Sequence, residues 1–281
     1  MHAVNSPLSP PVVHASYLAE HPHAILADVR WYLDGRDGHA AYAAGHLPGA
    51  VWVDLDEHLA ATGLPAGEGR HPLPTPAAFA ASMSRLGIGD DSLVIAYDDT
   101  GGLTASRLVV MLRMIGHDAA VLDGGIGAWP GPLQVGLGPT PQPATFSPVP
   151  WPTDRLALAD DVAALSSGGG VVLDARSTDR FTGRETLVDP RPGHIPGARN
   201  APWASVLAAD GTFRTTDELR SHFHALGADE GVETITYCGS GVSACMNIVA
   251  MERAGFTPPR LYVASWSGWS ADPDRKAALG A

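Results

Sequence analysis

The chain of 281 residues is 45% hydrophobic and 17% charged, a globular composition, and at roughly 150 residues per domain it is long enough for two domains. Its formal charge of −12 at pH 7 argues against general affinity for nucleic acids or acidic membrane surfaces, so an anionic ligand needs a local arrangement of donors. It contains 2 cysteines, which fits a reducing compartment and does not fit a disulfide scaffold.

Residues 1–11 lack the basic, apolar and small-residue order of a secretory signal. No apolar run approaches the roughly 18 residues of a membrane span, so we expect a cytoplasmic protein without a membrane partner. The 12 histidines are scattered and form no cluster with ligand spacing, so no metal site is expected.

The first half of the chain carries four landmarks. Residues 27–30 read Ala-Asp-Val-Arg, and residues 45–50 read Gly-His-Leu-Pro-Gly-Ala. An apolar run at 93–97 ends in tyrosine, and a tryptophan follows at Trp129. These landmarks matter because each of them returns in the second half.

Residues 131–152 are rich in proline and glycine and end in Pro-Val-Pro-Trp-Pro. Such a stretch cannot form a helix or a central strand. We therefore expect an extended and fairly stiff connector between two domains, residues 1–130 and residues 153–281.

The second half repeats the landmarks of the first. Residues 173–176 read Leu-Asp-Ala-Arg, residues 193–198 read Gly-His-Ile-Pro-Gly-Ala, a run at 233–237 again ends in tyrosine, and Trp269 matches the earlier tryptophan. The paired positions lie about 140 to 148 residues apart. Two copies of one domain explain this pattern better than chance.

Within the second copy, β-type runs alternate with helical spacing. Residues 170–174 and 233–237 read as strands, and residues 216–226 and 242–253 as helices, the latter closed by Gly255. This alternation predicts an α/β fold in each copy, a mostly parallel sheet flanked by helices. Ligands of such sheets gather beyond the carboxyl ends of the strands.

Cys238 stands at that place, directly after a predicted strand. It opens the segment Cys-Gly-Ser-Gly-Val-Ser, in which Gly239 and Gly241 let the backbone curl so that successive N–H groups converge. The helix that follows adds unpaired N–H groups at its first turn. Both features favour a thiolate, the nucleophilic form of cysteine.

With these motifs in place, the chain resembles a tandem rhodanese over roughly residues 24–269. The loop Cys-Gly-Ser-Gly-Val-Ser is similar to that of 3-mercaptopyruvate sulfurtransferases. Thiosulfate sulfurtransferases of this family carry Cys-Arg-Lys-Gly instead, and Gly239 and Ser240 stand in place of those cations. The resemblance implies two rhodanese-like domains and a sulfurtransferase.

The resemblance also assigns roles to the first copy. Asp98 stands where the second copy has Cys238, so the first domain is expected to be catalytically silent and to lend residues to the site. Asp54 and His71 match the aspartate and histidine that such a domain lends. Ser240 would complete their relay toward the substrate.

A donor carboxylate calls for arginine. Arg180 occupies the place of the family's first substrate-binding arginine, and Arg191 or Arg184 could supply the second, which does not align. Backbone N–H groups from Gly239 through Gly241 to Val242 and Ser243 are expected to hold the anionic sulfur.

Other interpretations remain. A cysteine phosphatase commonly carries an arginine six positions after its cysteine, where this chain has Ala244, and a non-catalytic rhodanese-like module tends to lose the cysteine altogether. Cys245 is either a core residue or a redox partner of Cys238.

The sequence therefore predicts transfer of a sulfane sulfur from 3-mercaptopyruvate through a persulfide on Cys238 to a thiol acceptor, such as thioredoxin or a small dithiol, or to cyanide. The alternative donor is thiosulfate. No cofactor is expected, and no nucleic-acid partner.

Overall fold

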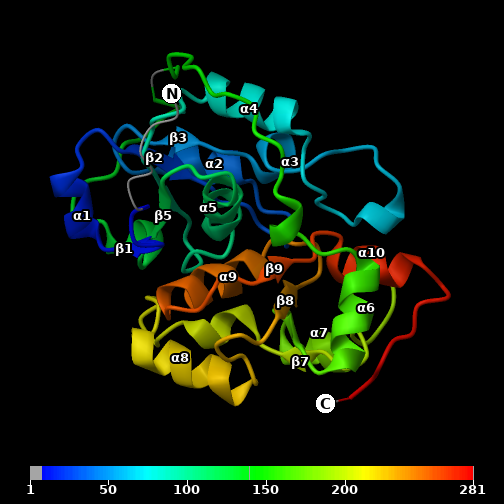
Figure 1. The fold of residues 1–281 in the computed structure, drawn as a ribbon. Coiled ribbons are helices and arrows are strands. Elements are labelled where there is room, and N and C mark those ends of the chain that lie inside the picture. The colour runs from blue at the N-terminus through cyan, green and yellow to red at the C-terminus, as the bar shows by residue number, and fades with distance from the viewer. Residues whose placement is uncertain (1–7, 139, 281) are drawn as a thin grey trace, which may run out of the picture.

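The computed structural model describes residues 8–138 and 140–280, so most of the stretch 1–11, in which no secretory signal is predicted, lies outside the described residues. Two α/β units follow one another along the chain, each with its own sheet of parallel strands and flanking helices (Figure 1). The predicted fold class is confirmed. Among the described residues, no helix has the length and apolar character to cross a bilayer.

The first unit has a five-stranded sheet in the order β1-β5-β4-β2-β3. Its strands are β1 (Val12–Val13), β2 (Ile25–Asp28), β3 (Val51–Trp52), β4 (Val94–Tyr97) and β5 (Ala119–Leu122). Strands β4 and β5 are buried along their whole length. Both of their faces are covered, so their sequences are continuous apolar runs without alternation.

The helices of the first unit cover this sheet. They are α1 (Ala15–Glu20), α2 (Gly38–Ala44), α3 (Leu55–His58), α4 (Pro76–Arg85) and α5 (Ala105–Met114), with the 3₁₀ turns η1 (Ala66–Glu68) and η2 (Gly125–Ala128). Helix α4 starts after Thr75, whose side chain accepts the N–H of Ala78, and Pro76 opens the helix where a missing N–H costs nothing.

The second unit has a four-stranded sheet in the order β7-β6-β8-β9. Its elements are β6 (Val171–Asp174), β7 (Arg199–Asn200), β8 (Thr234–Tyr237) and β9 (Arg260–Leu261), with η3 (Thr153–Arg155), α6 (Ala159–Gly168), α7 (Thr178–Thr182), η4 (Trp203–Val206), α8 (Thr216–Ala225), α9 (Ala244–Arg253) and α10 (Ser265–Ala271). The four predicted elements are present. The helix predicted from residue 242 begins two residues later because the preceding glycine loop is still turning.

The two sheets have the same register. Asp28 of β2 lies opposite Tyr97 of β4, and Asp174 of β6 lies opposite Tyr237 of β8. The hydroxyl groups of both tyrosines accept a backbone N–H from the Gly-His-x-Pro-Gly-Ala motif of their own unit. The duplication seen in the sequence is therefore a duplication of structure.

A buried arginine fastens each copy. Arg176 grips the carboxylate of Asp174 through Nε and Nη2 (3.1 and 2.6 Å) and donates to the carbonyl oxygen of Gly193 (2.9 Å). Arg30 makes the equivalent bonds in the first unit. The Asp-x-Arg motif thus ties the end of a central strand to the second motif of the same copy.

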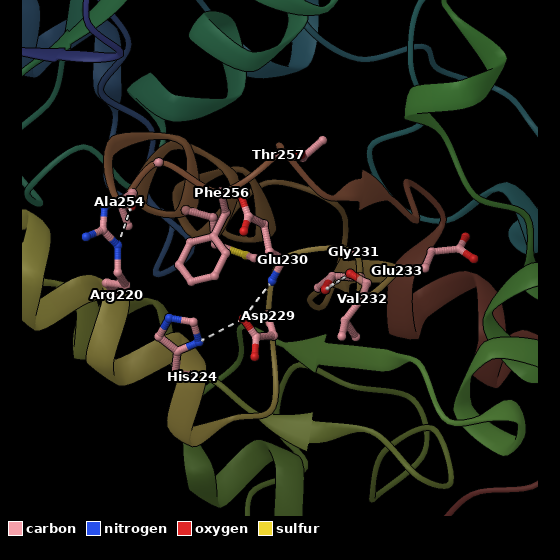
Figure 2. Close-up of a pocket in the computed structure, with 13 residues that line it drawn as sticks. Arg220, His224, Asp229, Glu230, Gly231, Val232, Glu233, Ala254, Phe256 and Thr257 are labelled. Carbon is pink, nitrogen blue, oxygen red and sulfur yellow. Dashed lines mark hydrogen bonds and ion pairs between the residues drawn. The ribbon is translucent and has the colours of Figure 1, made fainter.

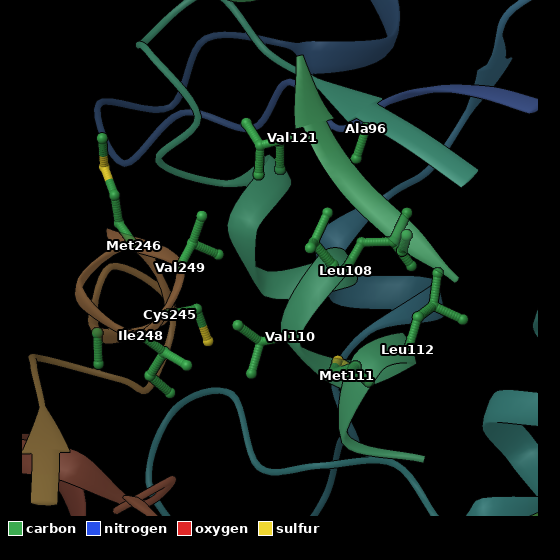
Figure 3. Close-up of a cluster of buried hydrophobic side chains, with 14 of the residues drawn as sticks. Ala96, Leu108, Val110, Met111, Leu112, Val121, Cys245, Met246, Ile248 and Val249 are labelled. Atoms are coloured by element: carbon green, nitrogen blue, oxygen red, sulfur yellow. The ribbon is translucent and has the colours of Figure 1, made fainter. Parts of the chain in front are cut away.

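The two units meet through α5 and α9. Figure 3 shows Val110 of α5 facing Cys245, Ile248 and Val249 of α9 within a cluster of buried apolar side chains. Both helices follow a central strand of their own sheet, so this packing brings the ends of the two sheets close to the same region.

The connecting stretch 131–152 forms no helix or strand in its described residues and runs along the first unit. Phe146 packs against Phe79, and the indole of Trp151 donates to the carbonyl oxygen of Pro74 (2.8 Å).

Candidate active site

The loop from Cys238 to Ser243 joins the carboxyl end of β8 to α9. The N–H of Gly241 points at the sulfur of Cys238, 3.1 Å away. Gly241 has φ +79°, and a Cβ there would lie 2.6 Å from the carbonyl oxygen of Val263, so glycine is required at this position. The carbonyl groups of Val242 and Ser243 accept hydrogen bonds from the first amides of α9.

The backbone of Cys238 is clamped by the residues that begin α10. Its N–H donates to Oγ of Ser265 (3.1 Å), and its carbonyl oxygen accepts the N–H of Trp266 (2.9 Å). Ser265 has φ +54°, a strained conformation for a residue other than glycine. Ser265 opens the Ser-Trp-x-x-Trp segment that this chain shares with tandem rhodaneses, but the sequence alone assigned it no contact with Cys238, 27 residues away.

Cys238 is 1% exposed and lies between an apolar core and a cationic region. On the cationic side, a Cβ on Gly239 would lie 2.5 Å from Nη2 of Arg180 and 2.9 Å from Nη2 of Arg70. The missing side chain of Gly239 therefore leaves room for two guanidinium groups beside the nucleophile.

Arg180 is where the sequence predicted a substrate-binding arginine, but its neighbour is Arg70 of the first unit. Arg184 pairs with Asp179 at the surface (2.9 Å), and the guanidinium of Arg191 donates to carbonyl oxygens of the C-terminal segment. Neither is brought to the loop. The sequence feature that could have indicated Arg70 as a site residue is its position directly before His71.

Asp189 binds this arginine cluster. Its carboxylate accepts two hydrogen bonds from Arg180 (2.9 and 2.7 Å) and one from Arg176 (3.0 Å), and Nη1 of Arg70 lies 3.9 Å away. Burial raises the pKa of Asp189, but the bonds and charges of Arg180 and Arg176 outweigh it and hold that pKa below its ordinary value. The carboxylate is therefore ionised at neutral pH.

A hollow of about 800 Å³ lies beside the cluster. It is bounded by both units, including Gly69, Arg70, Val188, Asp189 and Ser267. The hollow contacts Arg70 and Asp189, but neither Cys238 nor Arg180 is among its lining residues.

The first unit also supplies a histidine to the loop. Nδ1 of His71 lies 2.8 Å from Oγ of Ser240, and Nε2 lies 3.2 Å from a carboxylate oxygen of Asp56. Burial lowers the pKa of His71 to about 4, despite the opposing charge of Asp56, so the ring is neutral at pH 7. With Nε2–H directed at the carboxylate, Nδ1 accepts the hydroxyl proton of Ser240.

The carboxylate in this relay comes from Asp56, two residues beyond the predicted Asp54. Asp54 instead caps α3 and accepts the N–H groups of Asp56 (2.7 Å) and Glu57 (2.9 Å). The indole of Trp31 donates to the second carboxylate oxygen of Asp56 (2.8 Å), which holds it toward the histidine. An Asp-x-Asp sequence does not reveal which carboxylate caps the helix.

Arg107 of α5 connects the two units at the loop. Its guanidinium is fully buried and donates to the carbonyl oxygens of Gly241 (3.0 Å), His71 (3.0 Å) and Leu59 (3.2 Å). The thiol of Cys245 donates to the same carbonyl of Gly241 (3.3 Å). Burial raises the pKa of Cys245 to about 12, so it is a neutral thiol that supports the loop.

The equivalent loop of the first unit already encloses an anion. The buried carboxylate of Asp98 accepts hydrogen bonds of 2.8 to 3.0 Å from the N–H groups of Thr100, Gly102, Thr104 and Ala105. Asp98 has no sulfur atom, so it is no counterpart of the Cys238 thiol. The geometry also shows that this turn between strand and helix forms a cradle for negative charge.

A separate hollow of about 550 Å³ lies on the second unit, lined by residues such as Arg220, His224 and Phe256 (Figure 2). It opens beside Thr234, at the start of β8, whereas Cys238 follows the end of that strand. Its lining residues include none of the candidate active-site residues.

Comparison with known proteins agrees with this geometry. The model of the rhodanese-like domain matches residues 15–131 and again residues 158–272. A putative thiosulfate sulfurtransferase, SseB, of Mycobacterium tuberculosis is 42% identical over 266 residues, covering 92% of both chains. A probable 3-mercaptopyruvate sulfurtransferase of Pseudomonas aeruginosa is 39% identical over 275 residues, covering 95% of both. The crystal structure of SseA from Escherichia coli, described as a 3-mercaptopyruvate sulfotransferase, superposes with a TM-score of 0.81 and 31% identity, covering 92% of this chain and 99% of that one.

Proposed function

This chain belongs to the rhodanese-like family, and on that basis we propose that it is a sulfurtransferase that moves sulfur from 3-mercaptopyruvate to a thiol or to cyanide through a persulfide on Cys238. The observation that carries the proposal is the convergence of Cys238, the Ser240–His71–Asp56 relay and two guanidinium groups on one loop. The relay offers a path for a proton, and the arginines offer a seat for a carboxylate.

In the first half-reaction, the thiolate of Cys238 attacks the sulfur of mercaptopyruvate. The carbon–sulfur bond breaks and its electron pair passes to the pyruvate fragment as an enolate, while the new sulfur–sulfur bond forms on Cys238. The proton of the donor thiol ends on the enolate carbon, which gives pyruvate. Ser240, hydrogen-bonded to the neutral ring of His71, is placed to hold that proton during the transfer.

Arg180 and Arg70 bind the donor carboxylate in this proposal. Both guanidinium tips lie at the position that a side chain on Gly239 would occupy, directly beside the nucleophile. A pair of guanidinium groups suits a planar carboxylate because each can present two parallel N–H donors. Arg191, the residue predicted from the sequence, is committed to carbonyl groups of the C-terminal segment.

The persulfide anion would be held as the carboxylate of Asp98 is held in the first copy. The donors to Asp98 correspond, 140 residues later, to the amides of Ser240, Val242 and Ala244, with the N–H of Gly241 already on the sulfur. The outer sulfur lies about 2.05 Å beyond Sγ, comparable with the reach of a carboxylate oxygen. This comparison supports the predicted role for the amides of Gly241 and Val242 and adds Ser240 and Ala244, but it gives no support for Gly239 or Ser243.

In the second half-reaction, an acceptor thiolate attacks the outer sulfur and Cys238 leaves as a thiolate, which restores the starting state. A thioredoxin, a small dithiol or cyanide can each supply such a nucleophile. We place this reaction in the cytoplasm, where free thiols persist, as the low cysteine content favours. In the same proposal residues 1–130 form the silent domain, residues 131–152 the connector and residues 153–281 the catalytic domain.

Thiosulfate is the second candidate donor, since the relative from M. tuberculosis carries that donor in its name. Steady-state release of pyruvate from mercaptopyruvate, compared with formation of thiocyanate from thiosulfate and cyanide, separates the two. We expect the pyruvate-forming reaction to dominate in the wild-type protein and to be lost in Cys238→Ser. If turnover of thiosulfate dominates, thiosulfate is the donor in place of mercaptopyruvate. If Cys238→Ser remains active, Cys238 is not the nucleophile.

A further inference from the structure

The arginine cluster beside Cys238 contains its own buried counter-ion. Asp189 is 5% exposed and binds Arg180 through two parallel hydrogen bonds and Arg176 through one. The sequence predicts a second arginine in residues 184–191 and gives no role to a carboxylate there. A buried carboxylate in a seat for anions opposes the binding of those anions, so its presence calls for an explanation.

Each carboxylate near the cluster pairs with a particular arginine. Arg176 is already paired with Asp174, which grips it through two nitrogen atoms. Asp189 then offsets Arg180, from which it lies 2.7 Å away, more closely than Arg70, whose Nη1 lies 3.9 Å from it. Asp189 therefore lowers the summed charge of the pair Arg180 and Arg70 from about +2 to about +1.

We propose that Asp189 makes this site selective for donors with one negative charge and disfavours donors with two. The inference rests on the proposed function and concerns the class of donor. Mercaptopyruvate presents one carboxylate charge, which a seat of net charge +1 matches. Thiosulfate is a dianion, and its second charge is repelled by the field of Asp189.

The geometry allows Asp189 to act on the seat through Arg180. Asp189 bonds Nε and Nη2 of Arg180, and the same Nη2 faces the loop together with Nη2 of Arg70. The atom Nη2 of Arg180 lies 2.7 Å from Asp189 and would lie 2.5 Å from a Cβ on Gly239. Only one guanidinium group thus separates the carboxylate of Asp189 from the donor. At that distance the charge of Asp189 repels the charge of the donor.

The test compares Asp189→Asn with the wild-type protein in both donor reactions. Asparagine keeps the shape and an acceptor oxygen but removes the charge. We expect the ratio of kcat/KM for thiosulfate to kcat/KM for mercaptopyruvate to rise about tenfold or more, as expected for one unit of charge at an effective dielectric constant near 20. The matched control is Asp179→Asn, which removes the same charge from an exposed pair with Arg184 and should keep the wild-type ratio.

A second variant reverses the sign and covers the case in which Asp189→Asn fails to fold. Arg70→Gln removes one positive charge from the same seat. The inhibition constant, measured with mercaptopyruvate as the substrate, should then rise more for sulfate, a dianion, than for pyruvate, a monoanion. Asp189→Asn should strengthen inhibition by sulfate more than inhibition by pyruvate.

A folded Asp189→Asn protein that changes both donors by the same factor would show a positioning role and overturn the inference. Equal loss of sulfate and pyruvate inhibition in Arg70→Gln would overturn it as well. A wild-type protein that uses neither donor would instead overturn the proposed function, so the two failures are distinguishable.

Discussion

Nδ1 of His71 lies 2.8 Å from Oγ of Ser240, across 169 positions of chain and the boundary between the two units. Each unit alone lacks half of this contact. The first unit therefore supplies a side chain to the loop of Cys238, and the carbonyl group of the same histidine accepts a hydrogen bond from Arg107, which also donates to the carbonyl group of Gly241 in that loop.

Two neighbouring aspartates should behave differently when they are changed. Asp56→Asn removes the carboxylate that fixes the tautomer of His71, so Nδ1 no longer accepts the proton of Ser240 reliably, and we expect kcat to fall at least tenfold, roughly the lower range for general acid–base groups. Asp54→Ala removes only the cap of α3, so we expect a loss of about 1 kcal/mol in the free energy of unfolding and a kcat close to wild type. Steady-state kinetics and urea unfolding of both variants make the comparison. The reverse pattern would return the catalytic role to Asp54.

The stability of the protein should depend on the ionisation of His71. Its pKa in the folded state, about 4, lies below the unfolded value of 6.5, so the unfolded chain binds more protons between these limits and stability falls as the pH drops from about 6.5 toward 4. The contribution of His71 reaches up to about 3 kcal/mol for a shift of this size. We expect His71→Gln to reduce the loss of free energy of unfolding between pH 7.5 and pH 5, measured by urea titration at each pH.

Part of the dependence should remain in that variant, because burial also lowers the pKa values of His58, His117, His194 and His222. An unchanged difference between the two pH values would mean that His71 titrates normally in the folded protein.

Gly239→Ala tests whether the two guanidinium groups form the donor seat. The added methyl group would lie 2.5 Å from Arg180 and 2.9 Å from Arg70, so both tips must withdraw from the loop. Because the tips are flexible ends of long side chains, we expect the melting temperature to change little while KM for mercaptopyruvate rises several-fold. A wild-type KM in the folded variant would place the donor carboxylate elsewhere.

Asp98→Ala tests the role of the first copy. The variant leaves the amides that surround the carboxylate without an acceptor in a buried loop, and unsatisfied buried donors cost about 1–3 kcal/mol each before relaxation. We expect a loss of at least about 3 kcal/mol in the free energy of unfolding. Gly127→Ala is a suitable control, because a Cβ at Gly127 meets no atom within 4 Å. Equal stability of Asp98→Ala and wild type would show that the cradle contributes nothing to the fold.

The sequence predicted the parts of this architecture that depend on local pattern. The duplication, the strands ending before residues 175 and 238, and the glycine loop after β8 all follow from residues close together in the chain. The arrangement across the units has no such local signal. Arg70 and Asp56 join the site through contacts between distant parts of the chain. The N–H of Arg70 donates to Oγ of Ser267, and Asp56 is linked to Ser240 through His71.

Asp189 shows the same difficulty in reverse. An anionic donor needs cations, so the sequence of this segment predicts a role for its arginines. It predicts none for a carboxylate. The three-dimensional arrangement shows that this carboxylate binds Arg180 and Arg176 at once, a relationship set by the turn after α7 and not by spacing in the chain.

In the proposed reaction the sulfur passes through Cys238, and mass spectrometry of the protein after incubation with mercaptopyruvate alone detects this step. We predict one added sulfur, about 32 Da, on the peptide that contains both cysteines, present in Cys245→Ser, absent in Cys238→Ser and removed by a dithiol. An added sulfur that persists in Cys238→Ser, or pyruvate release by wild type without any sulfur on that peptide, would contradict the account.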